Sequence, residues 1–255
     1  MSNLSFIIKN KPSYSNIKHV VLYALPKIGK TTAVSLIPNN VILAFEDQSF
    51  FVEADIIDMR ANNDEQIKNK LKELPEYVKS LKEAGYKFIT IDTLSSMLPF
   101  GKYLGEALYS KTLIGKNWFS KNKAEYGDLL NLPKGLGYEY LRQGINRIYD
   151  YLFDSGLKVI TVAHVKEKYS DETGNVSMLD IDAPGSLSRS IAKDAQIVGY
   201  LTKKKKDEVW ISFKNFDNTI TGTIIKELQD TEILLTKRED DKIISNWDEI
   251  LKYIS

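Results

Sequence analysis

The segment Ala24–Thr32, with the sequence ALPKIGKTT, contains the residue types that bind the phosphates of a nucleotide. It directly follows the apolar run Val20–Tyr23. In a phosphate-binding loop, backbone N–H groups surround the phosphates, a lysine reaches the β- and γ-phosphates, a hydroxyl ligates Mg²⁺, and the dipole of the next helix favours anions. We therefore expect Lys30 and Thr31 to bind phosphate, Thr31 also to bind Mg²⁺, and further contacts to come from Pro26, Lys27, Ile28, Gly29 and Thr32.

One position departs from the usual pattern G-x-x-x-x-G-K-[ST], because its first glycine is Ala24 here. Alanine is compatible with that position if its φ angle stays negative. The alternative is that GKTT stands by chance at an ordinary helix start. The apolar run before the loop and the acidic residue described next both argue against chance.

Asp92 directly follows the apolar run Phe88–Ile91. Open α/β sheets bind ligands at the carboxyl ends of their strands, so a carboxylate at this point is placed to hold Mg²⁺ opposite Thr31, directly or through water. Taken alone, an apolar run followed by aspartate is a common strand end. The phosphate-binding loop upstream makes the metal role the better interpretation.

Two acidic residues, Glu46 and Asp47, follow the apolar run Val41–Phe45. Hydrolysis needs a carboxylate that orients and polarises the attacking water, and an acid on the strand beside Asp92 can reach that water. We expect Glu46, which is nearer to the strand end, to be the catalytic acid, and Asp47 is the other candidate. The alternative is an acidic turn that is exposed to solvent.

His164 follows the apolar run Leu157–Ala163 and is expected to close that strand, where its side chain would face the γ-phosphate. A purely structural histidine is an equally good interpretation. The polar segment 166–176 is predicted to be a loop. Arg189 and Lys193, on the helix expected next, are candidates for phosphate contacts or for a solvated helix face.

Short apolar runs alternate with amphipathic stretches, a pattern typical of an α/β sheet with helices on its faces. Amphipathic helices are expected at Asp64–Glu83, where Pro75 would kink or split the helix, and at Gly137–Ser155. The stretch Gly101–Gly137 follows neither pattern. Buried parallel strands are expected at His19–Ala24, Val41–Phe45, Lys87–Ile91 and Leu157–Ala163.

Beyond about residue 200 the pattern predicts an antiparallel end to the sheet and a short closing helix at Asn246–Tyr253. The run Lys203–Lys206 is expected to form a hairpin turn that either binds a phosphodiester backbone or keeps a sheet edge soluble. The strands are expected at Ile197–Thr202, Val209–Lys214, Thr221–Ile225 and Ile233–Thr236.

The composition excludes several classes of protein. With 255 residues the chain suits one large domain or two small ones. The absence of cysteine excludes disulfide scaffolds, zinc ribbons, iron–sulfur clusters and thiol catalysis, and two histidines exclude a histidine-rich metal site. A net charge of +1 excludes a protein whose whole surface coats nucleic acid. No apolar run approaches the roughly 18 residues that span a bilayer, so we expect a soluble intracellular protein.

Taken together, these segments give the sequence a resemblance to the RecA-like P-loop ATPases of bacteriophages, a group linked to single-strand annealing and recombination. The likeness covers about residues 18–202. The order of its segments, above all the strand that ends in Ala163-His164 and the later Pro184-Gly185, is what indicates this group. The segments are LYALPKIGKTT, ILAFEDQS, YKFITIDTLSSM, GYEYLRQGINRIYDYL, KVITVAHVKEK and DIDAPGSLSRSIAKDAQIVGYL.

The resemblance implies a single RecA-like α/β domain over residues 1–255, with a mainly parallel core at about 18–202 and an antiparallel β extension and short helix at about 203–255. It implies ATP and Mg²⁺ as ligands, binding of single-stranded DNA in phage recombination or replication, assembly into a ring or filament, no membrane contact, and a place in the host cytoplasm. It assigns catalysis to Lys30, Glu46, Asp92 and His164, the last as γ-phosphate sensor. The setting FEDQ, rather than the commoner DTEG type, leaves Glu46 and Asp47 both open.

Other functions use the same loop. A nucleotide-gated accessory protein with little turnover, which loads or regulates a helicase, polymerase or packaging machine, is the main alternative. A small-molecule kinase needs a lid with several arginines, and a GTPase needs an Asn-Lys-x-Asp motif, which is absent. An arginine finger, if one acts, must come from Arg60, Arg142, Arg147, Arg189 or Arg238, or else a lysine replaces it.

Overall fold

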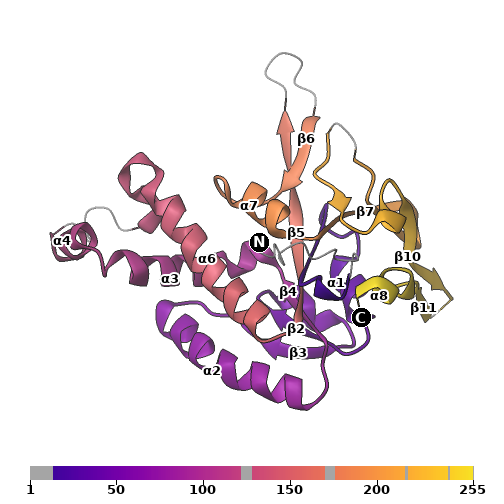
Figure 1. Cartoon of the computed structure of the whole chain (residues 1–255), viewed down its shortest axis with the longest axis horizontal. Coiled ribbons are helices and arrows are strands. Elements are labelled where there is room, and N and C mark those ends of the chain that lie inside the picture. The colour runs from indigo at the N-terminus through magenta and orange to yellow at the C-terminus, as the bar shows by residue number, and fades with distance from the viewer. Residues whose placement is uncertain (1–13, 122–127, 170–175, 216–217, 241, 255) are drawn as a thin grey trace, which may run out of the picture.

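A single twisted sheet forms the centre of the computed structural model, which describes residues 14–121, 128–169, 176–215, 218–240 and 242–254 (Figure 1). Its strand order is β11-β10-β8-β7-β1-β5-β4-β2-β3, with β6 paired to β5 and β9 paired to β7. The strands are β1 (His19–Ala24), β2 (Asn40–Ala44), β3 (Asp55–Asp58), β4 (Phe88–Asp92), β5 (Lys158–Tyr169), β6 (Val176–Ile181), β7 (Ile197–Lys205), β8 (Glu208–Ser212), β9 (Gly222–Thr223), β10 (Glu232–Glu239) and β11 (Lys242–Ser245).

Helices cover both faces of this sheet. Among the described helices, none is both long and apolar enough to cross a lipid bilayer. The α-helices are α1 (Lys30–Ser35), α2 (Asp64–Glu83), α3 (Leu94–Tyr109), α4 (Leu113–Lys121), α6 (Leu136–Asp154), α7 (Leu187–Asp194) and α8 (Asp248–Ile254). Short 3₁₀ turns are η1 (Tyr14–Asn16), η2 (Asp47–Phe51), η3 (Leu129–Asn131), η4 (Pro133–Gly135) and η5 (Lys226–Leu228).

The sheet is mainly parallel, as the sequence predicts. Strands β1, β2, β3, β4, β5 and β7 run parallel to their neighbours in this group. Strands β8, β10 and β11 continue the sheet in antiparallel pairs. Because parallel strands present their carboxyl ends at one edge, the loops after β1, β2, β4 and β5 are brought together there. The expected fold class, an α/β sheet with an antiparallel C-terminal extension, is confirmed.

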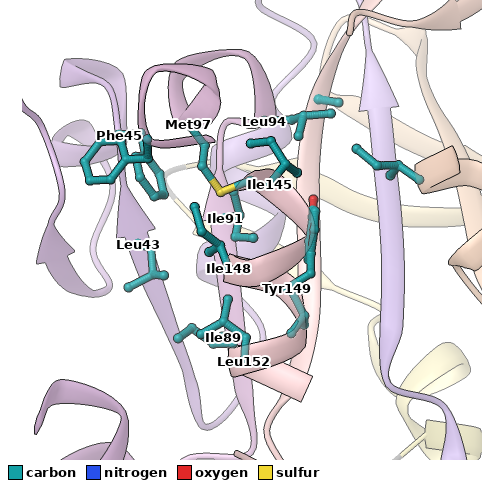
Figure 2. Close-up of a cluster of buried hydrophobic side chains, with 14 of the residues drawn as sticks. Leu43, Phe45, Ile89, Ile91, Leu94, Met97, Ile145, Ile148, Tyr149 and Leu152 are labelled. Atoms are coloured by element: carbon teal, nitrogen blue, oxygen red, sulfur yellow. The ribbon is translucent and has the colours of Figure 1, made fainter. Parts of the chain in front are cut away.

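Two hydrophobic cores lie on opposite faces of the sheet. Helices α2, α3 and α6 pack on one face, where Ile89 and Ile91 of β4 contact the apolar side of α6 (Figure 2). Helices α1 and α8 pack on the other face together with side chains of the antiparallel strands. The C-terminal extension therefore shares a core with the helix that follows the phosphate-binding loop.

Glycines let helices α3 and α6 approach closely, which explains Gly101 and Gly105 in the stretch 101–137 that the sequence left unassigned. A Cβ atom at Gly144 would lie 1.9 Å from the carbonyl oxygen of Gly101. A Cβ atom at Gly105 would lie 2.5 Å from the carbonyl oxygen of Tyr140. Both distances are far shorter than a van der Waals contact, so only glycine fits at these crossings.

The strand after α6 is longer than predicted. His164 does not close β5, because the strand continues to Tyr169 and pairs with β6 in an antiparallel hairpin that projects from the sheet (Figure 1). The loop predicted at 166–176 is therefore wrong for residues 166–169 and for Val176, which begins β6, and its part at 170–175 lies outside the described residues. Alternating charged residues at 166–168 gave no apolar signal for a strand that leaves the core.

Other boundaries also differ. Strands β3, β6 and β11 were not predicted. Strand β3 is a short, half-exposed edge strand, and β11 is short and partly exposed. Helix α2 continues through Pro75 without a break in its assignment. The lysine run does not form a turn as a whole, because Lys203–Lys205 belong to β7.

Candidate nucleotide-binding site

The loop between β1 and α1 has the backbone that a phosphate-binding loop requires. Gly29 caps the start of α1 with a φ angle of 104°, and Lys27 also has a positive φ of 63°. Ala24 is the last, fully buried residue of β1 and is not among the residues with positive φ. The alanine that replaces the usual first glycine thus occupies a conformation that alanine adopts freely.

Lys30 is held inside this loop. Its Nζ donates hydrogen bonds to the carbonyl oxygens of Ala24 at 3.2 Å and Leu25 at 3.0 Å. It also lies 3.2 Å from Nδ1 of His164. Only 6% of Lys30 is exposed, and this burial lowers its pKa, whereas the negative charges of Asp92 and Glu46 raise it. The loop therefore holds a cation at the N-terminus of α1.

Asp92 faces the loop from the carboxyl end of β4. Its Oδ2 accepts hydrogen bonds from Oγ1 of Thr31 at 2.9 Å and from Oγ of Ser49 at 2.8 Å. Its Oδ1 is buried and has no hydrogen-bond partner among the described residues. Burial raises the pKa of Asp92, while the hydrogen bonds from Ser49 and Thr31 lower it. A buried carboxylate oxygen without a partner beside a threonine hydroxyl fits Mg²⁺, which prefers oxygen ligands.

Glu46 lies beside Asp92 because β2 and β4 are paired, with Ala44 opposite Asp92. Its Oε2 accepts hydrogen bonds from the hydroxyls of Ser96 at 3.1 Å and Thr93 at 3.4 Å. Glu46 lines a hollow of about 450 Å³. Other residues that line this hollow are Pro26, Lys27, Gly29, Lys30, Thr31, Thr32 and His164.

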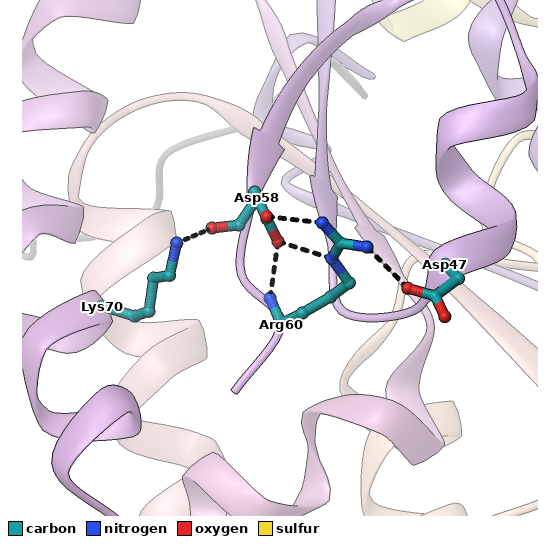
Figure 3. Close-up of polar contacts among 4 residues, drawn as sticks. All are labelled: Asp47, Asp58, Arg60 and Lys70. Atoms are coloured by element: carbon teal, nitrogen blue, oxygen red, sulfur yellow. Dashed lines mark hydrogen bonds and ion pairs between the residues drawn. The ribbon is translucent and has the colours of Figure 1, made fainter. Parts of the chain in front are cut away.

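Asp47 lies outside this hollow. Its side chain is 80% exposed and pairs with the guanidinium of Arg60 at 2.6 Å (Figure 3). Arg60 also donates to Asp58 of β3 at 2.8 Å and stacks on the ring of Phe50, with its guanidinium carbon 4.2 Å from the ring centroid. The two acids after β2 therefore point to different environments, and Glu46 is the one beside the loop.

His164 stands next to the loop on β5, opposite Ala24 in the register of β1 and β5. Burial and the positive charge of Lys30 lower its pKa, although Glu46 and Asp182 oppose that shift. A lowered pKa favours the neutral imidazole, whose Nδ1 can accept a hydrogen bond from Lys30. The structure thus brings His164 to the hollow, in contact with the loop lysine.

The structure adds residues that the sequence analysis missed. Ser49, which is fully buried, and Ser96 hold the carboxylates of Asp92 and Glu46. A serine in a short 3₁₀ turn carries no signal in its own type or spacing. Ser96 lies in the first turn of α3, which begins at Leu94, and its contact with Glu46 depends on the pairing of β2 with β4.

Other candidates lie elsewhere. Arg189 and Lys193 are exposed on α7 and do not line the hollow beside Lys30. Arg142 is paired with Glu139 on α6. Ile28 does not line that hollow either, but it lines a neighbouring one that also touches Gly29 and Thr32.

The strand–loop–helix geometry and the paired Thr31 and Asp92 define a P-loop nucleotide-binding domain of the ATPase type. The sequence model of the AAA domain matches residues 16–238, so the chain belongs to the AAA-domain family. Among solved structures it is similar to a KaiC-like protein of the hyperthermophilic archaeon Pyrococcus horikoshii OT3, with a TM-score of 0.45 and 13% sequence identity over 92% of this chain and 90% of that one. No curated protein matches the chain.

Proposed function

We propose that the protein hydrolyses ATP in the hollow beside the P-loop. The observation that carries this proposal is the pairing of Thr31 with Asp92 at 2.9 Å, which leaves Asp92 Oδ1 without a partner among the described residues. Thr31 and Asp92 would hold Mg²⁺, which when bound neutralises phosphate charge and polarises the γ-phosphate. Lys30 and the backbone of the loop from Pro26 to Thr32 bind the phosphates.

Glu46 is the catalytic acid in this proposal. It lines the same hollow as Lys30, whereas Asp47 is paired with Arg60 outside it. A carboxylate held by the hydroxyls of Ser96 and Thr93 keeps a fixed direction and can orient the attacking water. His164, in contact with Lys30, lies where a change at the γ-phosphate would alter its hydrogen bond, so we assign it the role of sensor.

We further propose that hydrolysis is coupled to single-stranded DNA in phage recombination or replication, in a homo-oligomeric ring or filament. This part rests on the resemblance of the ordered segments from LYALPKIGKTT to DIDAPGSLSRSIAKDAQIVGYL. We also propose that residues 1–255 form one domain, because α8 and the antiparallel strands share a core with α1.

The experiment measures phosphate release from Mg²⁺–ATP with and without a single-stranded oligonucleotide. Turnover that rises with the oligonucleotide supports a DNA-dependent ATPase. A turnover rate that is the same with and without the oligonucleotide contradicts the coupling to DNA but still supports ATP hydrolysis. Tight ATP binding without turnover in either condition supports the alternative, a nucleotide-gated accessory protein.

A further inference from the structure

The lysine run 203–206 divides into two pairs that face different surroundings. Lys204 pairs with Glu232 at 2.9 Å, and Lys205 pairs with Glu208 at 3.5 Å. Lys203 and Lys206, in contrast, have no hydrogen bond or ion pair between their side chains and any residue that the structure describes. Two of the four charges are therefore available to a ligand.

Strand geometry explains where Lys203 lies. Successive side chains of a strand point to opposite faces of the sheet, so Lys203 shares a face with Leu201. Leu201 is fully buried in the core that contains Ala33 and Val34 of α1. Lys203 therefore lies on the face of the sheet that packs against α1, outside the core and near the start of that helix.

Lys203 and Lys206 line a hollow of about 460 Å³ together with Arg238 of β10. The guanidinium of Arg238 also has no partner among the described residues. The opposite wall of the hollow is formed by Gly29 and Thr32. Three cations thus surround a space that opens onto the P-loop, and Asp207 is the acidic residue in its lining.

The strands that carry this wall contact the loop and α1. A Cβ atom at Gly29 would lie 3.5 Å from Cγ2 of Val209, which follows the lysine run in β8. Nε1 of Trp247 donates a 2.7 Å hydrogen bond to the carbonyl oxygen of Ala33 in α1. The backbone N–H of Arg238 donates at 2.9 Å to the carbonyl oxygen of Asp207 in the hairpin turn. The strands and turn that carry the cations therefore pack directly against the P-loop and α1.

We propose that Lys203, Lys206 and Arg238 form a cationic wall that binds the α-phosphate and sugar end of the nucleotide in the same chain. This inference rests on the proposed function, since it extends the site of Lys30. The cationic hollow shares Gly29 and Thr32 with the hollow beside Lys30, but it does not touch Glu46 or His164. It is therefore on the side of the loop away from the γ-phosphate.

The location of the cationic wall predicts which nucleotides bind more weakly when its charges are removed. A P-loop backbone surrounds the α- and β-phosphates, whereas its lysine reaches the β- and γ-phosphates. Cations placed away from the γ-phosphate contact groups that ADP and ATP share. Loss of these cations should weaken the binding of ADP and ATP by the same factor, unlike loss of an arginine finger, which acts on the γ-phosphate.

The test is equilibrium binding of ADP and ATP to the full chain, with a matched pair of double variants. Lys203→Gln/Lys206→Gln removes two charges from the hollow, and Lys204→Gln/Lys205→Gln removes two charges from the same run outside it. We expect the first double variant to raise both dissociation constants about tenfold, because each exposed charged contact contributes modestly. We expect the second to leave them within about twofold of the wild type. Arg238→Gln should act like the first pair, with Arg238→Lys recovering part of the loss.

Equal effects of the two double variants overturn the proposal, because the loss then reflects net charge alone. An unchanged nucleotide affinity in the first double variant, with weaker binding of a single-stranded oligonucleotide, also overturns it and assigns the hollow to nucleic acid. If the wild type binds ATP and Lys30→Ala does not, either result leaves the proposed function intact. If the wild type binds neither nucleotide, both the proposed function and this inference fail.

Discussion

Oγ1 of Thr31 lies 2.9 Å from Oδ2 of Asp92, although 61 residues separate them along the chain. The contact exists because β1, β5 and β4 are adjacent and parallel, so the residues after β1 and at the end of β4 meet at one edge of the sheet. A second donor, Ser49, binds the same oxygen at 2.8 Å, and the other oxygen of the carboxylate has no hydrogen-bond partner within the described part of the chain.

Ser49→Ala should shift the pH dependence of Mg²⁺-dependent ATP binding. The hydrogen bond from Ser49 lowers the pKa of Asp92, against a larger rise caused by burial. Without Ser49 that pKa rises further, so Asp92 becomes protonated at a higher pH and the acidic limit of binding moves upward. Apparent Mg²⁺ affinity, titrated from pH 5 to 8, is the measurement, with Ser110→Ala on the distant end of α3 as control. An unmoved acidic limit would show that Ser49 does not act through Asp92.

Glu46→Gln and Asp47→Asn form a matched comparison for the choice of catalytic acid. Each change removes one negative charge from neighbouring positions, but Glu46 lines the hollow beside Lys30 and Asp47 is paired with Arg60. We expect Glu46→Gln to lower the rate of ATP hydrolysis about 100-fold or more, in the range of general acid–base contributions. Asp47→Asn should change that rate by less than about threefold. The reverse order would transfer the catalytic role to Asp47.

The strands and helices of the core were predictable because each carries a periodic apolar pattern. His19–Ala24 was predicted to the residue, and α2 over Asp64–Glu83 likewise. The P-loop was predictable because its chemistry fixes a local sequence. By contrast, β3 and the outer half of β5 were not predictable, since β3 has only four residues and the outer half of β5 is mostly charged, so neither shows an apolar run or a sustained apolar–polar alternation.

The contacts that complete the site could not be predicted for a different reason. Ser49 and Arg238 have roles that depend on which strands become neighbours, and this is decided by the whole sheet rather than by local sequence. The same holds for Lys203 and Lys206, which are indistinguishable from Lys204 and Lys205 until the faces of β7 and the turn that follows it are known. The contacts that could not be predicted are thus those that depend on the pairing of segments far apart in the sequence.

Gly144→Ala should destabilise the protein by disturbing the crossing of α3 and α6. A Cβ atom there would lie 1.9 Å from the carbonyl oxygen of Gly101, so the helices must separate. Overpacking of this kind costs about 1–3 kcal/mol. Chemical denaturation measures the free energy of unfolding, and Gly222→Ala is the control, because a Cβ atom at Gly222 meets nothing within 4 Å. Equal stability of Gly144→Ala and the wild type would contradict the close helix packing.

His19 should make the fold sensitive to acid. It is buried between β1 and the rings of Tyr149 and Phe153, and this burial lowers its pKa from 6.5 to about 3. The unfolded chain therefore binds a proton between these pH values that the folded protein does not, and the free energy of unfolding falls by on the order of a few kcal/mol as the pH drops from 6.5 toward 3. His19→Gln keeps a partner for Thr161 and removes the titration. Its unfolding free energy should change less over this range, and identical slopes for both proteins would contradict the assignment.

Whether the P-loop of this chain hydrolyses ATP can be measured as phosphate release from Mg²⁺–ATP by the wild type and by Lys30→Ala, each checked for folding by its circular dichroism spectrum. We expect turnover by the wild type that requires Mg²⁺ and falls at least about 100-fold in Lys30→Ala, because the variant lacks the cation that the loop holds and that binds the β- and γ-phosphates in the proposed function. Undiminished turnover in a folded Lys30→Ala would contradict hydrolysis at this loop.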